Sequence, residues 1–172
     1  AVAGDTVYYR DGTYNISNRT AINPSNSGMN AEAKITFSAY PGETPLFQQI
    51  TYSIGITISG KNWIKVTGLT FHDFTGTSTI TLGGSYNEIS HCKFVNSTKQ
   101  SAGSRIFVIG NSNDGAVHNW FHHNYLSGRY NTSPCTEGID LLRIGMADRD
   151  DINDYNTVEY NYFEYSAHAI LV

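Results

Sequence analysis

Three charged residues near position 140 have the types and the spacing to recognise an acidic ligand. Glu137, Asp140 and Arg143 lie on or next to a short apolar run that ends at Ile144. An arginine can hold a carboxylate through two parallel hydrogen bonds. On a strand, Asp140 and Arg143 point to opposite faces because side chains alternate with a period of two. We predict a substrate-binding cluster from these three residues; the alternative is an ordinary surface ion pair.

A second candidate is an acidic segment at residues 148–154. It contains four carboxylates, from Asp148, Asp150, Asp151 and Asp154. Calcium prefers six to eight oxygen ligands, so clustered carboxylates of this kind suit it. The segment lacks the glycine and the distal glutamate of an EF-hand loop. Calcium is therefore the one cofactor that these residues suggest. The alternative is a solvated acidic loop inserted at a corner of the fold.

Histidines supply the remaining candidates. His118 and His122 would share a face of one strand, with His123 beside them, but no third ligand is evident for a transition metal. We therefore interpret these three as partly exposed histidines around a core strand. His168 is the single candidate for a general base, because an imidazole titrates near neutral pH.

Short strands must position these residues. Of the 172 residues 40% are hydrophobic and 15% charged, with 16 glycines and 12 tyrosines, a mixture typical of an all-β chain rich in turns. Runs that alternate apolar and other residues predict strands at 54–58, 80–82, 106–109 and 141–144. No segment keeps a helical period for three turns. The tyrosines and Trp120 are either sugar-stacking rings or simply good strand formers.

A repeat defines the expected fold. Copies of a pattern with an asparagine, an apolar residue two positions on and another seven positions on begin at Asn62, Asn87, Asn119 and Asn156. The intervals are 25, 32 and 37 residues. Such spacing predicts a right-handed, single-stranded parallel β-helix (a β-solenoid), with loops inserted at its corners, as a single domain over residues 1–172.

Equivalent residues of successive coils should lie about 4.8 Å apart, the spacing of paired strands. The repeat predicts one core stack and one polar stack. The core stack would contain Ile64, Ile89, Phe121 and Val158. The polar stack would contain Thr67, Cys92, Asn124 and Asn161, with the amides bonded between neighbouring coils.

Several segments resemble a known group of proteins. Gly4 to Val7 with Asp11 to Tyr14, and 35–37 with Tyr40 to Glu43, resemble the opening of many secreted right-handed β-helix proteins. Residues 142–145 and 156–163 resemble the central coils of polysaccharide lyases of the chondroitinase B and alginate lyase type. The resemblance implies a secreted protein that binds or processes a polysaccharide of uronic acids, by β-elimination if it is catalytic.

The catalytic residues of that family are matched only in part. The family uses a lysine base, arginines, and a calcium ion held by an asparagine and two glutamates. Arg143 aligns with an arginine of the family, and Glu137 lies near the position of the asparagine that binds calcium in the family. Ala169 and Leu171 fall near the two glutamates and cannot bind metal. The lysine and second arginine would lie beyond Val172, so the chain either continues into further coils or is a non-catalytic relative.

Other partners are limited by charge and composition. The net charge of −4 and the absence of a basic run argue against nucleic acid, and no apolar run reaches the length of a membrane helix. Cys92 is expected to be a small buried residue, with a bridge to Cys135 as the alternative. N-glycosylation sequons, which fit surface loops of a secreted protein, occur at Asn15, Asn18, Asn96 and Asn131.

A structural role is the alternative function. The segment 169–172 is apolar and strand-like, and an uncovered strand edge invites pairing. Covering that edge with another copy would produce head-to-tail self-association. The protein would then be a structural or adhesive subunit of a fibre or filament.

Overall fold

The structure, a computed structural model, describes residues 1–74, 78–97, 105–109, 116–128, 140–144, 155–164 and 168–171. For residues 78, 105–108, 140–144 and 168–171 it describes the backbone alone. Every regular element in these ranges is a β-strand. They accordingly contain no helix long and apolar enough to cross a membrane.

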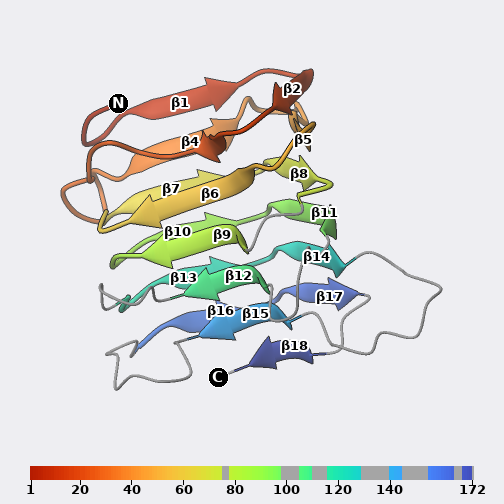
Figure 1. Ribbon diagram of the computed structural model, residues 1–172. Helices are drawn as coiled ribbons and strands as arrows, with labels where there is room; N and C mark the ends of the chain where they lie inside the picture. Colours follow the sequence, from red (N-terminus) through yellow and green to blue (C-terminus); the bar gives the residue numbers. More distant parts are fainter. Residues whose placement is uncertain are drawn as a thin grey trace.

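The strands form three parallel sheets of six strands each (Figure 1). Sheet A contains β1 (Thr6–Tyr9), β4 (Ile35–Ala39), β7 (Ile64–Thr67), β10 (Glu88–Ser90), β13 (Trp120–His122) and β16 (Thr157–Glu159). Sheet B contains β2 (Thr13–Ile16), β5 (Leu46–Gln49), β8 (Thr70–His72), β11 (Lys93–Ser97), β14 (Tyr125–Gly128) and β17 (Tyr162–Glu164). Sheet C contains β3 (Thr20–Ile22), β6 (Ile54–Ser59), β9 (Ser78–Gly83), β12 (Arg105–Ile109), β15 (Asp140–Ile144) and β18 (His168–Leu171).

The chain passes through sheets A, B and C in turn, so each coil contributes one strand to each sheet. The result is a right-handed parallel β-helix, as the sequence predicts. The four apolar runs expected to be strands are β6, β9, β12 and β15, one above another in sheet C. Figure 1 shows the coils stacked along one axis, with the two ends of the chain at opposite ends of the stack.

The core consists of in-register side chains from all three sheets. Phe47, Phe71 and Phe94 of sheet B stack with ring centroids 5.1 and 5.2 Å apart, and all three are at most 2% exposed. Ile56 and Ile80 of sheet C belong to the same core and are fully buried. A single coil has no partner for its apolar face, and stacking supplies one.

The predicted stacks need one correction, in the first copy of the repeat. Val66, not Ile64, pairs in register with Ile89. The polar stack is shifted in the same way, since Thr70 pairs with Lys93 and therefore Leu69, not Thr67, stands at the position of Cys92. The reason is that Asn62 precedes the corner by two residues more than the asparagines of the later copies do. The other members of both stacks are confirmed.

The corner between sheets A and B has a fixed length in the last four coils. Two residues join the strands there, at 68–69, 91–92, 123–124 and 160–161. The first residue of each pair has a positive φ, between 53° and 73°. The corner before sheet A also uses the left-handed conformation, at Trp63, Tyr86, His118 and Tyr155.

Candidate functional site

Two rows of aromatic rings run along the outside of the β-helix, one on each side of sheet A. The leading ladder precedes sheet A and contains Trp63, Tyr86, His118 and Tyr155, with consecutive centroids 4.3, 4.9 and 5.0 Å apart. The trailing ladder follows sheet A and contains His91, His123 and Tyr160, with centroids 5.0 Å apart.

These ladders stabilise the corners. A bulky residue at positive φ is strained, and stacking at about 0.5–1.5 kcal/mol for each pair offsets part of that strain. Rings inside a ladder are covered on both faces by their neighbours, which leaves only their edges to a ligand. Exposure alone therefore does not make Tyr86 or His118 a sugar platform.

Buried asparagines close the same corners from inside. Each accepts a hydrogen bond from a backbone N–H of the previous coil: Asn119 Oδ1 from Asn87 and Asn124 Oδ1 from Cys92, both at 2.9 Å. Each also donates from Nδ2 to a carbonyl of the previous coil. The asparagines of the repeat thus fix the ends of the sheet A strands.

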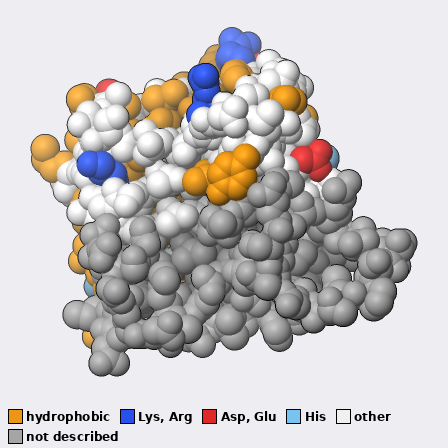
Figure 2. Space-filling view, in the orientation of Figure 1, with side chains coloured by type: hydrophobic (Ala, Val, Ile, Leu, Met, Phe, Trp, Pro, Cys, Tyr) orange, Lys and Arg blue, Asp and Glu red, His pale blue; other side chains and the backbone are white. Residues whose placement is uncertain are grey.

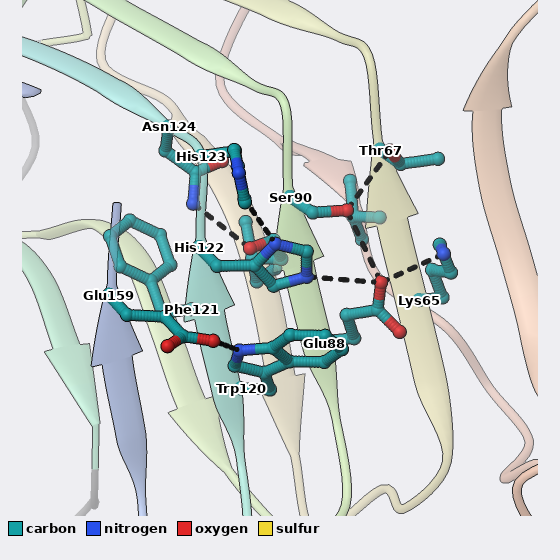
Figure 3. Close-up of polar contacts among 12 residues, drawn as sticks. Lys65, Thr67, Glu88, Ser90, Trp120, Phe121, His122, His123, Asn124 and Glu159 are labelled. Atoms are coloured by element: carbon teal, nitrogen blue, oxygen red, sulfur yellow. Dashed lines mark hydrogen bonds and ion pairs between the residues drawn. The ribbon is translucent and has the colours of Figure 1, made fainter. Parts of the chain in front are cut away.

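The outer face of sheet A carries a cluster of charged and polar side chains around Glu88 (Figure 3). Glu88 lies 2.8 Å from both Lys34 and Lys65, and its Oε1 lies 3.4 Å from His122 Nε2 and 3.3 Å from the donating Ser90 hydroxyl. The side chain of Glu88 is only 8% exposed. Two ammonium groups share this one carboxylate, so the centre of the cluster has an excess of positive charge.

The environment of Glu88 keeps it ionised. Burial raises the pKa of this carboxyl, but the hydrogen bonds and charges of Lys34 and Lys65 outweigh burial and lower the pKa to about 2. Burial is also the largest influence on His122 and lowers its pKa, with Glu88 opposing. At neutral pH the cluster therefore holds an anionic Glu88 beside a neutral His122.

Trp120 provides a flat apolar surface next to this cluster. Its indole stacks on the His122 ring at 3.7 Å, and its Nε1–H donates to Glu159 Oε1 at 2.8 Å. The residue remains 41% exposed. Because one face of the indole rests on His122, the exposed area is available on the other face. Trp120 differs in this respect from the ladder rings.

A chain of hydrogen bonds connects Glu88 to the surface through two histidines. His122 Nδ1 lies 2.8 Å from His123 Nδ1. A neutral imidazole has one N–H, and the contact with Glu88 assigns it to Nε2 of His122. His123 then donates its Nδ1–H to His122 and keeps a lone pair on Nε2. His123 is exposed and is held between the rings of the trailing ladder, so this nitrogen can accept a proton.

This grouping contrasts with another face of the molecule. Sheet C lies in front of sheet A in Figure 1, and Figure 2 shows that side as a surface. On its described part, a few charged side chains are set among polar and hydrophobic atoms. The two lysines and the histidine around the buried Glu88 carboxylate lie on sheet A or directly before one of its strands.

The predicted cluster at Arg143 lies on a different sheet. Asp140 and Arg143 belong to β15 in sheet C, where Arg143 pairs with Val108 and Leu171, and the structure describes only their backbone. His168 begins β18, paired with Asp140, again with the backbone alone described. Glu137 and the calcium candidates Asp148, Asp150, Asp151 and Asp154 lie outside the described residues. These residues stay predictions.

The other candidates are partly placed. Asn15 and Asn18 are exposed, whereas Asn96 donates its side-chain amide to Asp73. Asn131 and Cys135 lie outside the described residues. Cys92 is a buried free thiol, which confirms its expected role as a small core residue. His118 does not share a strand face with His122, because His118 sits in the left-handed corner before β13.

Within the described residues no group of three or more histidine, cysteine or acidic side chains could hold a metal ion. In the cluster on sheet A, the charged partners of Glu88 are Lys34, Lys65 and His122. Sequence reasoning missed Glu88 and Lys65 and named Trp120 only as one of many aromatic rings, although Glu88 and Trp120 directly follow asparagines of the repeat. Since Ile89 and Phe121 point inward, a period of two places their neighbours Glu88 and Trp120 outward.

No protein-family model and no curated protein sequence matches this chain. Among solved structures, its fold is similar to that of a polysaccharide lyase of the PL6 family from Pseudopedobacter saltans, with a TM-score of 0.53 and 15% sequence identity. The match covers 95% of this chain and 43% of the lyase, so this chain spans less than half the length of that protein. The likeness shows a common parallel β-helix fold.

Proposed function

We propose that this protein binds an acidic polysaccharide built of uronic acids across the outer face of sheet A, and that it acts on this polymer outside the cell. The observation that carries the proposal is Trp120, an exposed indole held by His122 and Glu159 and paired in register with Glu88, the carboxylate that Lys34 and Lys65 share. Support also comes from the solved β-helix with the same fold, which is a polysaccharide lyase.

The chemistry of a sugar suits this surface. A pyranose ring has a face of C–H groups that packs on an aromatic ring, while its hydroxyls need polar partners around the edge. Trp120 offers the ring, and Glu159 and Lys65 offer an acceptor and a donor on either side of it. A uronate adds a carboxylate, and Lys65, which is 34% exposed, can approach it from the cluster that Glu88 holds in place.

The same face holds groups suited to β-elimination. The lone pair on His123 Nε2 can take the proton from the carbon next to the uronate carboxylate. The electrons left behind form a carbon–carbon double bond, the bond to the leaving glycosidic oxygen breaks, and that oxygen takes a proton from solvent. Lys65 offsets the charge that builds on the carboxylate. His122 and Glu88 stabilise the positive charge that His123 gains.

Binding is tested by isothermal titration with polygalacturonate and alginate, using dextran as a neutral control. Wild-type protein should bind the uronate polymers and not dextran, and Trp120→Ala should weaken binding roughly tenfold. Tyr86→Ala is the matched control, because it removes an exposed ring whose faces are already covered. Equal affinity of wild type and Trp120→Ala, or equal affinity for dextran, would contradict the proposal.

Cleavage is tested separately, by the ultraviolet absorbance of the unsaturated uronate that elimination produces. His123→Ala should abolish product formation with little change in affinity. His118→Ala is the matched control, since it removes a histidine of the same conformation from the leading ladder. Binding by the wild type without any unsaturated product would exclude the elimination step and leave the binding function intact.

A further inference from the structure

A hollow of about 550 Å³ opens at the corner between sheets A and B, on the three coils that precede that of Trp120. Its walls include Glu43, Leu46, Gly68, Thr70, His91 and Lys93. These residues come from three successive coils, because Leu46, Thr70 and Lys93 pair in register along sheet B. The volume is within the range of small-molecule sites.

The hollow exists because the trailing ladder is interrupted. His91, His123 and Tyr160 stack at one position of successive coils, and the same position on the preceding coil is Gly68. Gly68 keeps the left-handed conformation of the corner, with φ at 73°, but has no ring. Among the described residues, no ring therefore covers the face of His91 that is turned toward Gly68. On the side of the preceding coil, Ala39 lies within van der Waals reach of a Cβ added at Gly68.

The charged groups of the hollow differ in whether they already have hydrogen-bond or ion-pair partners. Glu43 accepts hydrogen bonds from Arg10 Nε at 2.8 and 2.9 Å and from the Asp11 backbone at 2.6 Å, so its charge is compensated and its position fixed. Lys93 is exposed and has no ion-pair partner in the described part of the chain. The hollow thus combines a rigid acceptor, an uncompensated ammonium and a free imidazole face.

We propose that this hollow is a subsite for one uronate ring of the polysaccharide. The sugar ring takes the place of the missing ladder ring and packs on His91, its carboxylate pairs with Lys93, and its hydroxyls reach Thr70 and Glu43. His91 also contacts the edge of His122, at 5.8 Å, and so connects the hollow to the ring on which Trp120 stacks. The inference rests on the proposed function and gives the polymer a second anchoring point.

The test is a nuclear magnetic resonance titration of the full chain with trigalacturonate, with its methyl ester as the uncharged control. Two probes are followed together: the imidazole C–H of His91 for the hollow and the indole N–H of Trp120 for sheet A. Trigalacturonate should shift both signals. The methyl ester should bind at least tenfold more weakly.

Two variants separate the hollow from the rest of the face. Gly68→His should fill it, because histidine already adopts this conformation at 91 and 123, and the added Cβ meets only Ala39, its side chain at 3.3 Å and its backbone N at 3.8 Å. It should abolish the His91 shift and keep the Trp120 shift. Lys93→Met removes the ammonium, keeps the hydrocarbon stem and tests the same subsite without touching the corner; it should weaken affinity about tenfold.

The outcomes distinguish the two proposals. A Trp120 shift without a His91 shift would overturn the subsite and leave the binding face standing. A His91 shift that Gly68→His abolishes and Lys93→Met weakens, without a Trp120 shift, would support the subsite and overturn the binding face. No shift at either probe overturns both.

Discussion

Replacing Asn119 by alanine should remove one set of hydrogen bonds from the corner before sheet A. Asn119 is 1% exposed. Its Oδ1 accepts from the Asn87 backbone at 2.9 Å, and its Nδ2 donates to the Gly84 carbonyl at 2.9 Å and to Asn156 Oδ1 at 3.0 Å. Alanine makes none of these bonds, and the space is too enclosed for bulk water to replace them.

The expected cost follows from the groups left behind. The Asn87 N–H and the Gly84 carbonyl both lose a partner in a buried corner, and each such loss costs about 1–3 kcal/mol. We expect Asn119→Ala to lower the free energy of unfolding by about 3 kcal/mol in total. For a chain of this length that corresponds to a fall in melting temperature of roughly 6–12 °C.

Thermal and urea unfolding followed by circular dichroism measure this difference. Asn62→Ala is the matched control, because Asn62 is exposed and its Oδ1 accepts one hydrogen bond, from the Ser85 backbone at 2.8 Å. The control should cost about 0.5–1.5 kcal/mol. If Asn119→Ala is no more destabilising than Asn62→Ala, the hydrogen bonds of the buried asparagines do not stabilise the corners.

Three further predictions concern single side chains. Because the pKa of Glu88 is about 2, below its ordinary 4.5, its contribution is complete above about pH 4.5 and is lost as the pH falls toward 2. The free energy of unfolding of the wild type should therefore fall by about 2–3 kcal/mol over this pH range, allowing for screening at the half-exposed Lys65, and Glu88→Gln should lack this fall. The same fall in Glu88→Gln would contradict the lowered pKa of Glu88. Burial raises the pKa of Cys92 to about 12, so iodoacetamide at mildly alkaline pH should modify Cys92 only in unfolded protein, as peptide mass spectrometry would show. Tyr86→Ala should lower the free energy of unfolding by about 2 kcal/mol through two lost ring contacts, measured in urea, and should leave polygalacturonate affinity unchanged.

The fold is readable from the sequence because its signal is local and repeated. Strands of sheet C such as β9 and β12 are short β-branched runs, and the asparagines at 87, 119 and 156 mark one corner in each coil. The register of the first copy is the exception. Ile64 occupies the corner position that asparagine fills later, so aligning Asn62 with Asn87 displaces that copy by two residues.

The candidate site is less readable because it depends on distances between coils. Lys34 and Glu88 are 54 residues apart, and their contact requires three coils to stack in the correct register across loops of different length. The left-handed corners are also hidden, since tyrosine and tryptophan rarely adopt positive φ and nothing local marks them. Alternation around Ile89 and Phe121 does predict which side chains point outward, though not which of them meet.

The constant two-residue corner between sheets A and B has a consequence for engineering. Coil length varies in this protein, but in the last four coils the variation falls in the B–C and C–A connections, which range from three residues at 165–167 to twelve at 145–156. Foreign loops could therefore be grafted at those two corners without shifting the A–B corner. Insertions after β17 should be tolerated, whereas a single residue added between β10 and β11 should disrupt the stack.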